Sequence, residues 1–347
     1  MTGKMKGKQS IHFDNPPRII SSSSVVGDKE GDGPLGEYFD IIENDPMCGA
    51  STWEEAESKF QEKAANLAIQ KSKIGKEQIR YIVAGDLLGQ MIATSFGIGT
   101  LQIPLFGVYG ACSTMGESLS LASILIDGGF ADYTMAITSS HFASAERQFR
   151  FPLAYGNQRP FASTWTVTGS GAVILASADK LSSEQRKDSI AITGITTGVV
   201  TDYGIKDSMN MGACMAPAAC NVIYGHLQDN QLEPSYYDRI ITGDLGVIGK
   251  KILLDMLKTK GYDITKNHMD CGMAIYSAGE QKTQAGGSGC GCAAVTLAAY
   301  ILHKLHSGEW KRVLFVPTGA LLSQISFNEG NSVPGIAHGV AIERIGA

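Results

Sequence analysis

The sequence has few clustered positive charges, and this excludes one broad class of partner. Outside the first eight residues, MTGKMKGK, there is no run of Lys or Arg, and the net charge of the 347 residues is −5. A protein that binds the phosphate backbone of DNA or RNA normally carries a basic patch. We therefore expect no nucleic-acid partner.

The N-terminal sequence also lacks the apolar segment of a secretory signal peptide. The seven cysteines are an odd number in a long chain, which favours reduced thiols in a cytosol-like compartment. Cys290 and Cys292 form a Cys-x-Cys pair without the further ligands of a metal site, so we predict neither a metal nor a cofactor. Residues 87–116 carry no charge, but they include Pro104, glycines and polar residues. We interpret them as buried strand, loop and helix start rather than as a membrane span.

Hydrophobic residues make up 44% of the chain, which is enough for a substantial core. Residues 1–17 are polar, end in Pro-Pro and are predicted to form a flexible tail. An amphipathic helix is predicted at 51–72, with Ser51 or Thr52 as its N-cap. Runs rich in apolar and β-branched residues predict strands at 18–26, 80–87, 133–138 and 169–176.

The second half of the sequence repeats the order of the first. The segment RIITGDL at 239–245 matches RYIVAGDL at 80–87, and 287–310 matches 109–130, with Cys292 at the place of Cys112. Strands predicted at 312–317 and 335–343 complete the match. The repeat predicts two related halves, residues 18–178 and 179–347.

Each half contains one helix with apolar side chains on every face, which must be covered all round and therefore lie between two sheets. Two such helices with amphipathic helices outside predict an α/β fold, a five-layer αβαβα sandwich whose halves are related by a pseudo-twofold axis. Both helices would begin near that axis, so Cys112 would lie close to residues 286–292. The partial positive charge of a helix start would favour a thiolate or a bound anion at Cys112.

Three segments of the sequence resemble the thiolase superfamily, which includes thiolases and the condensing ketoacyl synthases. They are GACSTMGESL around Cys112, RPFASTWTVTGSGAVILA at 159–176 and AGGSGCGCAAVTLA at 285–298. The resemblance covers nearly the whole chain after residue 18 and implies a thiolase-like fold with Cys112 at the nucleophile position. It also implies a homodimer that pairs through an edge strand of the N-terminal half.

More narrowly, the sequence is similar to a family of soluble sporulation proteins, from FDNPPRIISSSSVVG through NMGACMAP to PGIAHGVAIER. These proteins belong to the apparatus that moves dipicolinic acid in spore-forming bacteria. The similarity implies a protein that binds dipicolinate rather than making carbon–carbon bonds. Its implied partners are other membrane and soluble proteins of that apparatus. Its implied location is the cytoplasmic, spore-core side of the inner spore membrane, peripherally attached and without a transmembrane segment.

A condensing enzyme needs His, or His and Asn, beside its cysteine to move protons and hold the developing charge. The superfamily's two catalytic His residues would fall at 286–288 and 242–244, where this chain has Gly-Gly-Ser and Thr-Gly-Asp. The last loop, FVPTG at 315–319, lacks the second cysteine of thiolases. The sequence therefore favours a binding protein. An acyl-transferring condensing enzyme that uses Cys112 alone or with His338 stays open, as does a purely structural scaffold.

Dipicolinate is a flat pyridine ring with two carboxylates, so its site needs N–H and O–H donors and apolar walls. Small-residue helix starts and central strand ends supply such groups near the predicted axis. The predicted ligand-binding residues are Cys112, Ser113, Ser139, His141, Ser288, Cys290, Gly319 and His338. Cys112 is equally consistent with an apolar filler, and the two histidines with structural hydrogen bonding.

For six further residues we favour structural roles. The predictions are Arg150 and Arg159 at the surface, Trp165 and Phe161 in packing, and Asp86 and Asp244 bracing turns.

Overall fold

The computed structural model describes residues 4–149 and 159–346 of the chain. In the N-terminal half the strands are β1 (Met5–Lys6), β2 (Ser10–His12), β3 (Arg18–Gly27), β4 (Ile41–Glu43), β5 (Tyr81–Asp86), β6 (Leu105–Gly107), β7 (Tyr133–Ser140), β8 (Trp165–Thr166) and β9 (Gly169–Ala176). The helices there are α1 (Asp28–Gly31), η1 (Gly36–Tyr38), α2 (Trp53–Ser72), η2 (Lys76–Gln78), α3 (Ile92–Gly99), η3 (Ala111–Ser113), α4 (Thr114–Asp127), α5 (Phe142–Phe149) and η5 (Ala178–Lys180).

The C-terminal half has the strands β10 (Ser189–Thr197), β11 (Arg239–Thr242), β12 (His268–Asp270), β13 (Gly287–Ser288), β14 (Arg312–Val316), β15 (Thr318–Ala320) and β16 (Gly335–Ile345). Its helices are α6 (Ser183–Lys187), α7 (Met211–Asn230), η6 (Pro234–Tyr236), α8 (Gly246–Thr259), α9 (Cys271–Ile275), α10 (Ala278–Gln281), α11 (Cys290–Thr296), the π-helical turn η7 (Leu297–Ile301), α12 (Leu302–His306) and α13 (Gln324–Asn328). The helix predicted at 51–72 is α2, and Thr52 is its cap, because its hydroxyl accepts from the backbone N–H of Glu55 at 3.2 Å.

The two halves use the same strand order and the same pattern of directions. The N-terminal order is β3-β9-β7-β5-β6 and the C-terminal order is β10-β16-β14-β11-β12. In each half the first two pairings along this order are antiparallel and the last two are parallel. The halves join where Arg18 and Ile19 of β3 pair with Ala191 and Ile190 of β10. The repeat detected in the sequence is therefore a repeat of the fold.

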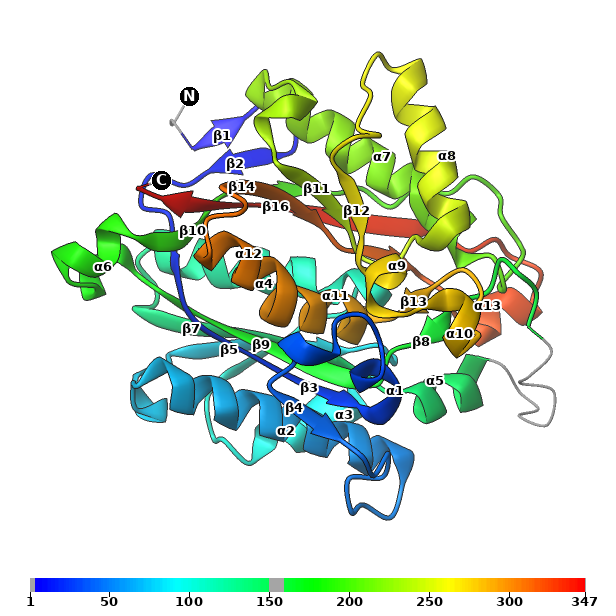
Figure 1. Cartoon of the computed structure of the whole chain (residues 1–347), viewed down its shortest axis with the longest axis horizontal. Helices are drawn as coiled ribbons and strands as arrows, with labels where there is room; N and C mark the ends of the chain where they lie inside the picture. Colours follow the sequence, from blue (N-terminus) through cyan, green and yellow to red (C-terminus); the bar gives the residue numbers. More distant parts are fainter. Residues whose placement is uncertain (1–3, 150–158, 347) are drawn as a thin grey trace.

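The elements stack in five layers, as predicted (Figure 1). Helices α2 and α3 cover the outer face of the N-terminal strands, and α7 and α8 cover the outer face of the C-terminal strands. The helices α4, α11 and α12 lie between the two sets of strands. Successive strand residues point to opposite faces of the sheet. Ile82 packs in the cluster beneath α2, whereas Val83 packs in the central cluster.

The central helix α4 is not covered on every side, which corrects the prediction for it. Leu121 is 41% exposed and Ile124 is 37% exposed, although Met115 and Leu119 are fully buried. An apolar helix must bury its faces. Within the described residues of one chain, the face with Leu121 and Ile124 is left open.

The N-terminal residues form strands where the sequence predicted a flexible tail. Ile11 of β2 pairs with Ile195 of β10, and Met5 of β1 pairs with Ile11. The carboxylate of Asp229 on α7 accepts hydrogen bonds from the backbone N–H groups of Lys8, Gln9 and Ser10. The prediction was wrong because these few residues lack a hydrophobic pattern and are held mainly by backbone hydrogen bonds.

Among the residues that the structure describes, no helix combines the length and apolar character needed to cross a lipid bilayer.

Gly171 of β9 allows α11 to lie directly on the sheet. A Cβ atom at this position would be 2.5 Å from the carbonyl carbon and oxygen of Ala294. We expect Gly171→Ala to lower the free energy of unfolding by about 2–3 kcal/mol, because the backbone of α11 must move away. Thermal or urea unfolding measures this effect. The control is Gly99→Ala, because a Cβ there meets nothing within 4 Å; equal stability of the two variants would contradict the packing argument.

Candidate functional site

Cys112 lies in a tight turn at the start of α4, close to the centre of the molecule. It belongs to η3 and is 3% exposed. The preceding residue, Ala111, has φ of 51°, a left-handed conformation that costs free energy for a residue with a Cβ atom. Gly319 packs against this turn, since a Cβ at 319 would lie 2.2 Å from the carbonyl oxygen of Gly110. The strained backbone therefore fixes the position of the thiol.

A buried carboxylate, Asp244, connects the segments that surround the thiol. It follows β11 and accepts hydrogen bonds from the Ser288 hydroxyl at 3.0 Å, the Gly289 N–H at 3.0 Å and the Thr318 hydroxyl at 2.9 Å. The Ser288 Oγ atom in turn lies 3.9 Å from the Cys112 Sγ atom. The structure thus places Cys112, Ser288 and Asp244 together, at the positions where the thiolase resemblance puts the cysteine and its imidazole partners.

Burial and the charge of Asp244 both favour the neutral form of the Cys112 thiol. Burial raises the pKa of Cys112 well above its usual value, and the nearby Asp244 carboxylate raises it further. Burial also raises the pKa of Asp244, to about 6. These effects outweigh the attraction of the helix start for an anion, so the thiolate expected from the sequence is disfavoured.

Three more of the predicted residues lie behind the thiol and are occupied with one another or with neighbours. The thiol of Cys290 donates to the carbonyl of Ser139 at 2.9 Å, and Cys290 packs in one small cluster with Cys112. The Ser139 hydroxyl donates to Glu57 on α2 at 2.9 Å. The Ser113 hydroxyl donates to the carbonyl of Gly110 at 2.8 Å. These groups therefore stabilise the site's back wall.

The two predicted histidines hydrogen-bond elsewhere. His141 Nε2 lies 2.8 Å from the carbonyl oxygen of Pro46, and its ring lies against Trp53. Burial lowers the pKa of His141. His338 Nε2 lies 3.0 Å from the carboxylate of Glu117, one turn along α4 from Cys112.

The free space beside Cys112 is small. The cavity measures about 20 Å³, room for about one water molecule. Of the eight predicted ligand-binding residues, Cys112 and Ser288 line it. The full lining consists of Leu87, Tyr109, Ala111, Cys112, Phe149, Thr166, Met211, Ser288, Ala320 and Leu322. A planar dicarboxylate would enter only if a wall such as Phe149 moved aside.

The other sequence candidates have mostly structural surroundings. Asp86 accepts from the N–H groups of Leu88 and Thr94 and so braces its turn, as predicted. Arg159 forms a buried ion pair with Glu146 at 2.8 Å, so the prediction of a surface role was wrong for it. Arg150 lies outside the described residues.

The two aromatic candidates differ from each other. Trp165 stacks on Phe142 with ring centroids 4.0 Å apart, in the packing role predicted for it. Phe161 is 60% exposed, so the packing prediction was wrong for this ring.

Among residues 4–149 and 159–346, no group of three His, Cys, Asp or Glu side chains is placed to hold a metal ion.

Sequence reasoning gave Asp244 a bracing role and did not include it among the site residues. The hydrogen bonds of Asp244 do brace the turn, but they also bring Ser288 to the thiol. The available signal was its place in the Thr-Gly-Asp segment, where the resemblance puts a catalytic His.

Comparison with known proteins gives a family and a fold. The family model described as stage V sporulation protein AD matches residues 7–343. Stage V sporulation protein AD of Bacillus subtilis (strain 168) is 44% identical over 343 residues, which cover 99% of each chain.

Solved structures of condensing enzymes share the fold at low identity. The 3-oxoacyl-[acyl-carrier-protein] synthase III of Aquifex aeolicus is 13% identical with a TM-score of 0.56, covering 94% of this chain and 99% of the other. Cerulenin-bound OleA of Xanthomonas campestris is 15% identical with a TM-score of 0.59, covering 96% and 97%. These likenesses confirm the thiolase-like fold predicted from the sequence.

The raised pKa of Cys112 predicts slow alkylation. We expect iodoacetamide to modify Cys112 at least tenfold more slowly at pH 8 than the half-buried Cys48, with a rate that still rises above pH 9. Asp244→Asn removes the carboxylate that raises this pKa, so modification at pH 8 should become faster. Peptide mass spectrometry measures both rates.

The matched control is Asp86→Asn, which changes the corresponding carboxylate of the other half. The account would be contradicted if iodoacetamide modified Cys112 as fast as Cys48 at pH 8. It would also be contradicted if Asp244→Asn left the modification rate of Cys112 unchanged.

Proposed function

This chain belongs to the stage V sporulation protein AD family, and from this premise we propose that it is a non-catalytic subunit that binds dipicolinate. It would act in the machinery that moves dipicolinate into the developing spore and out again on germination. Its partners would be other membrane and soluble proteins of that machinery. It would be attached peripherally to the cytoplasmic, spore-core side of the inner spore membrane.

The observation that carries the non-catalytic part is the composition of the Cys112 site. A nucleophilic cysteine needs a base or a lowered pKa. Here the groups beside the thiol are Ser288 and Asp244, and burial together with Asp244 raises the thiol pKa. The chain has the fold of condensing enzymes, while burial and Asp244 raise the pKa of its thiol.

The same site supplies the groups that support ligand binding. Ser288, Thr166 and the Cys112 thiol are polar groups on the cavity wall, and Leu87, Phe149 and Leu322 are apolar ones. Asp244 has a pKa of about 6, so the carboxylate that would repel an anionic ligand is neutralised more readily than an ordinary aspartate.

A second candidate function, acyl transfer to Cys112, is favoured by one observation. Asp244 is buried, has a pKa of about 6 and reaches the thiol region through Ser288. A carboxylate with such a pKa is suited to accept a proton near neutral pH.

The exposed apolar residues support a homodimer. The edge strand β6 exposes Leu105 and Phe106, and α4 exposes Leu121 and Ile124. A second copy that pairs along β6 would cover the open apolar edge strand, and the open face of α4 is a further apolar surface that a partner can cover.

Binding of dipicolinate is expected to strengthen as the pH falls from 8 to 6. The ligand is an anion in this range, and Asp244 loses its charge as the pH approaches about 6, so repulsion decreases. Calorimetry should show at least threefold tighter binding at pH 6 than at pH 8, and Asp244→Asn should remove most of the difference.

The control is His141→Gln, because His141 lies outside the cavity and should leave affinity and its pH dependence unchanged. Absence of binding heat in folded protein at both pH values would refute the dipicolinate proposal and leave the scaffold interpretation.

Incubation with acyl-CoA distinguishes the two candidate functions. We expect the intact mass of the protein to remain unchanged, because the protonated thiol does not attack the thioester. A mass increase of one acyl group that disappears in Cys112→Ala would contradict the non-catalytic proposal and support acyl transfer.

The dimer predicts a simple change of mass in solution. Wild-type protein should sediment as a species of twice the chain mass of 36.9 kDa. Phe106→Lys should shift it towards the monomer, because a charge would be buried at the paired edge. Ile325→Lys is the control, since Ile325 is 74% exposed in the other half; a monomeric wild type would contradict the proposal.

A further inference from the structure

Strand β3 has a short stretch of unpaired edge. One edge pairs with β9 from Arg18 to Val26. On the other edge, β10 pairs with Arg18 and Ile19, β4 pairs from Val25 onwards, and no strand of the described residues pairs with 20–24. The Ser24 N–H on this edge donates to Asp40 at 2.9 Å. Because N–H groups of alternate residues point to the same edge, that of Ser22 also points outward.

The corresponding edge in the other half is occupied by a strand. Each strand carries an irregularity, between Ile19 and Ser21 in β3 and between Ile192 and Gly194 in β10. The three residues after it in β10, 194–196, pair with β2. The three residues after it in β3, 21–23, are the open ones. The fold therefore fills one of two equivalent edges and leaves the other free.

The outer helix beside each edge carries a different side chain near its C-terminal end. This difference indicates the chemistry of an occupant. Helices α7 and α2 are both 20 residues long. Asp229, the residue before the last of α7, accepts from the N–H groups of the strand added to β10. The matching residue of α2 is Lys71. At this place an acceptor has been replaced by a cationic donor.

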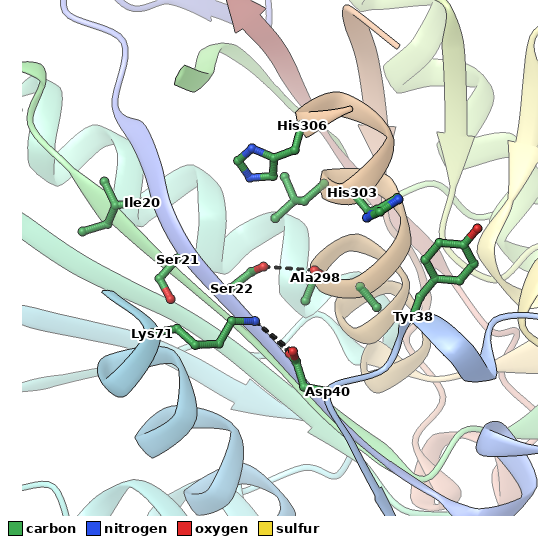
Figure 2. A pocket seen from close by; sticks show the side chains of 11 residues that line it. Ile20, Ser21, Ser22, Tyr38, Asp40, Lys71, Ala298, His303 and His306 are labelled. Atoms are coloured by element: carbon green, nitrogen blue, oxygen red, sulfur yellow. Dashed lines mark hydrogen bonds and ion pairs between the residues drawn. The ribbon is translucent and has the colours of Figure 1, made fainter. Parts of the chain in front are cut away.

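The open edge forms the floor of a groove of about 360 Å³ (Figure 2). Ser22 and Lys71 lie on one side, and His303 and His306 project from α12 on the other. The volume falls in the range of ligand-binding sites, about 300–1,000 Å³. The wall that carries the histidines continues from the π-helical turn η7, an irregularity often found at functional sites.

The hydrogen-bonding groups left in the groove include several donors. Asp40 already accepts from Lys71 at 2.9 Å and from Ser24. The Lys71 ammonium, the imidazoles of His303 and His306 and the hydroxyl of Tyr38 are the remaining polar tips. An occupant that brings acceptors can use the N–H and O–H groups of these side chains.

We propose that this groove binds an extended acidic segment of a partner protein, added to β3 as β2 is added to β10. The segment pairs its backbone with the N–H and C=O of Ser22, and its carboxylates face Lys71 and the two histidines. Strand addition to a free edge is an established mode of peptide recognition. This interaction is separate from the Cys112 cavity and goes beyond the proposed binding of dipicolinate.

The test uses the full-length protein and a phage-displayed library of random heptapeptides, with Ser22→Pro as counter-selection. Proline removes the outward N–H of Ser22 without removing a β3–β9 hydrogen bond. We expect selected peptides to be rich in Asp and Glu. By fluorescence anisotropy their synthetic versions should bind at least tenfold more weakly to Ser22→Pro, Lys71→Glu and His303→Glu. Lys76→Glu, with the same charge change outside the groove, should bind as the wild type does.

The opposite results are equally specific. The proposal would be overturned if no peptides were enriched, or if the peptides bound Lys71→Glu and His303→Glu as tightly as the wild type. If Ser22→Pro does not fold, the variants at these two exposed positions provide the test. Displacement of the peptide by dipicolinate at near-stoichiometric concentration would also overturn it, since the groove would then be a site for the small ligand. If Lys71→Glu bound dipicolinate as the wild type does, the result would support the peptide-groove proposal. It would also show that this proposal can be tested separately from the proposed function.

Discussion

A buried carboxylate must be satisfied by hydrogen bonds, and at the centre of this molecule Asp244 accepts them from two other segments at once. Donors from Ser288, Gly289 and Thr318 join the end of β11 to the start of α11 and to β15. This network places Ser288 beside Cys112, and burial together with Asp244 raises the pKa of the thiol. The position of Ser288 and part of the rise in the thiol pKa therefore depend on Asp244.

Most of the fold was readable from the sequence because its signals are local and occur twice. Apolar runs marked the central strands, and the match between the halves implied a shared strand order, which the pairings confirm. The predictions that failed concern contacts that the repeated elements do not determine. The strand β2 is held by backbone hydrogen bonds to β10 and Asp229, and the open face of α4 depends on which elements of the chain pack beside it.

The site was predictable in position and less so in detail. Cys112 and Ser288 meet because both begin the central helices near the axis. His141 was placed correctly at a strand end, but whether its ring turns to the cavity or to Pro46 depends on the path of the chain after β7, which periodicity does not specify. His338 likewise finds Glu117, a partner from another element. Asp244 appeared as a turn residue because its role arises where three distant segments converge.

The pseudo-symmetry lets the two halves carry different side chains on one backbone frame. At the centre, hydrogen bonds to Asp244 hold together the segments that surround Cys112. At the periphery, the two equivalent strand edges have diverged: β10 carries β2, and β3 faces an open groove. In both places the backbone frame is shared by the halves and the side chains set the chemistry.

The central claim is that dipicolinate occupies the Cys112 cavity without reacting there. A crystal structure of the protein soaked or grown with dipicolinate tests it most directly. The account predicts ligand density between Cys112 and Ser288, with Phe149 displaced from the position in which it closes the cavity and with no covalent link to the sulfur. Density at another site, or an empty cavity at saturating ligand, would contradict it.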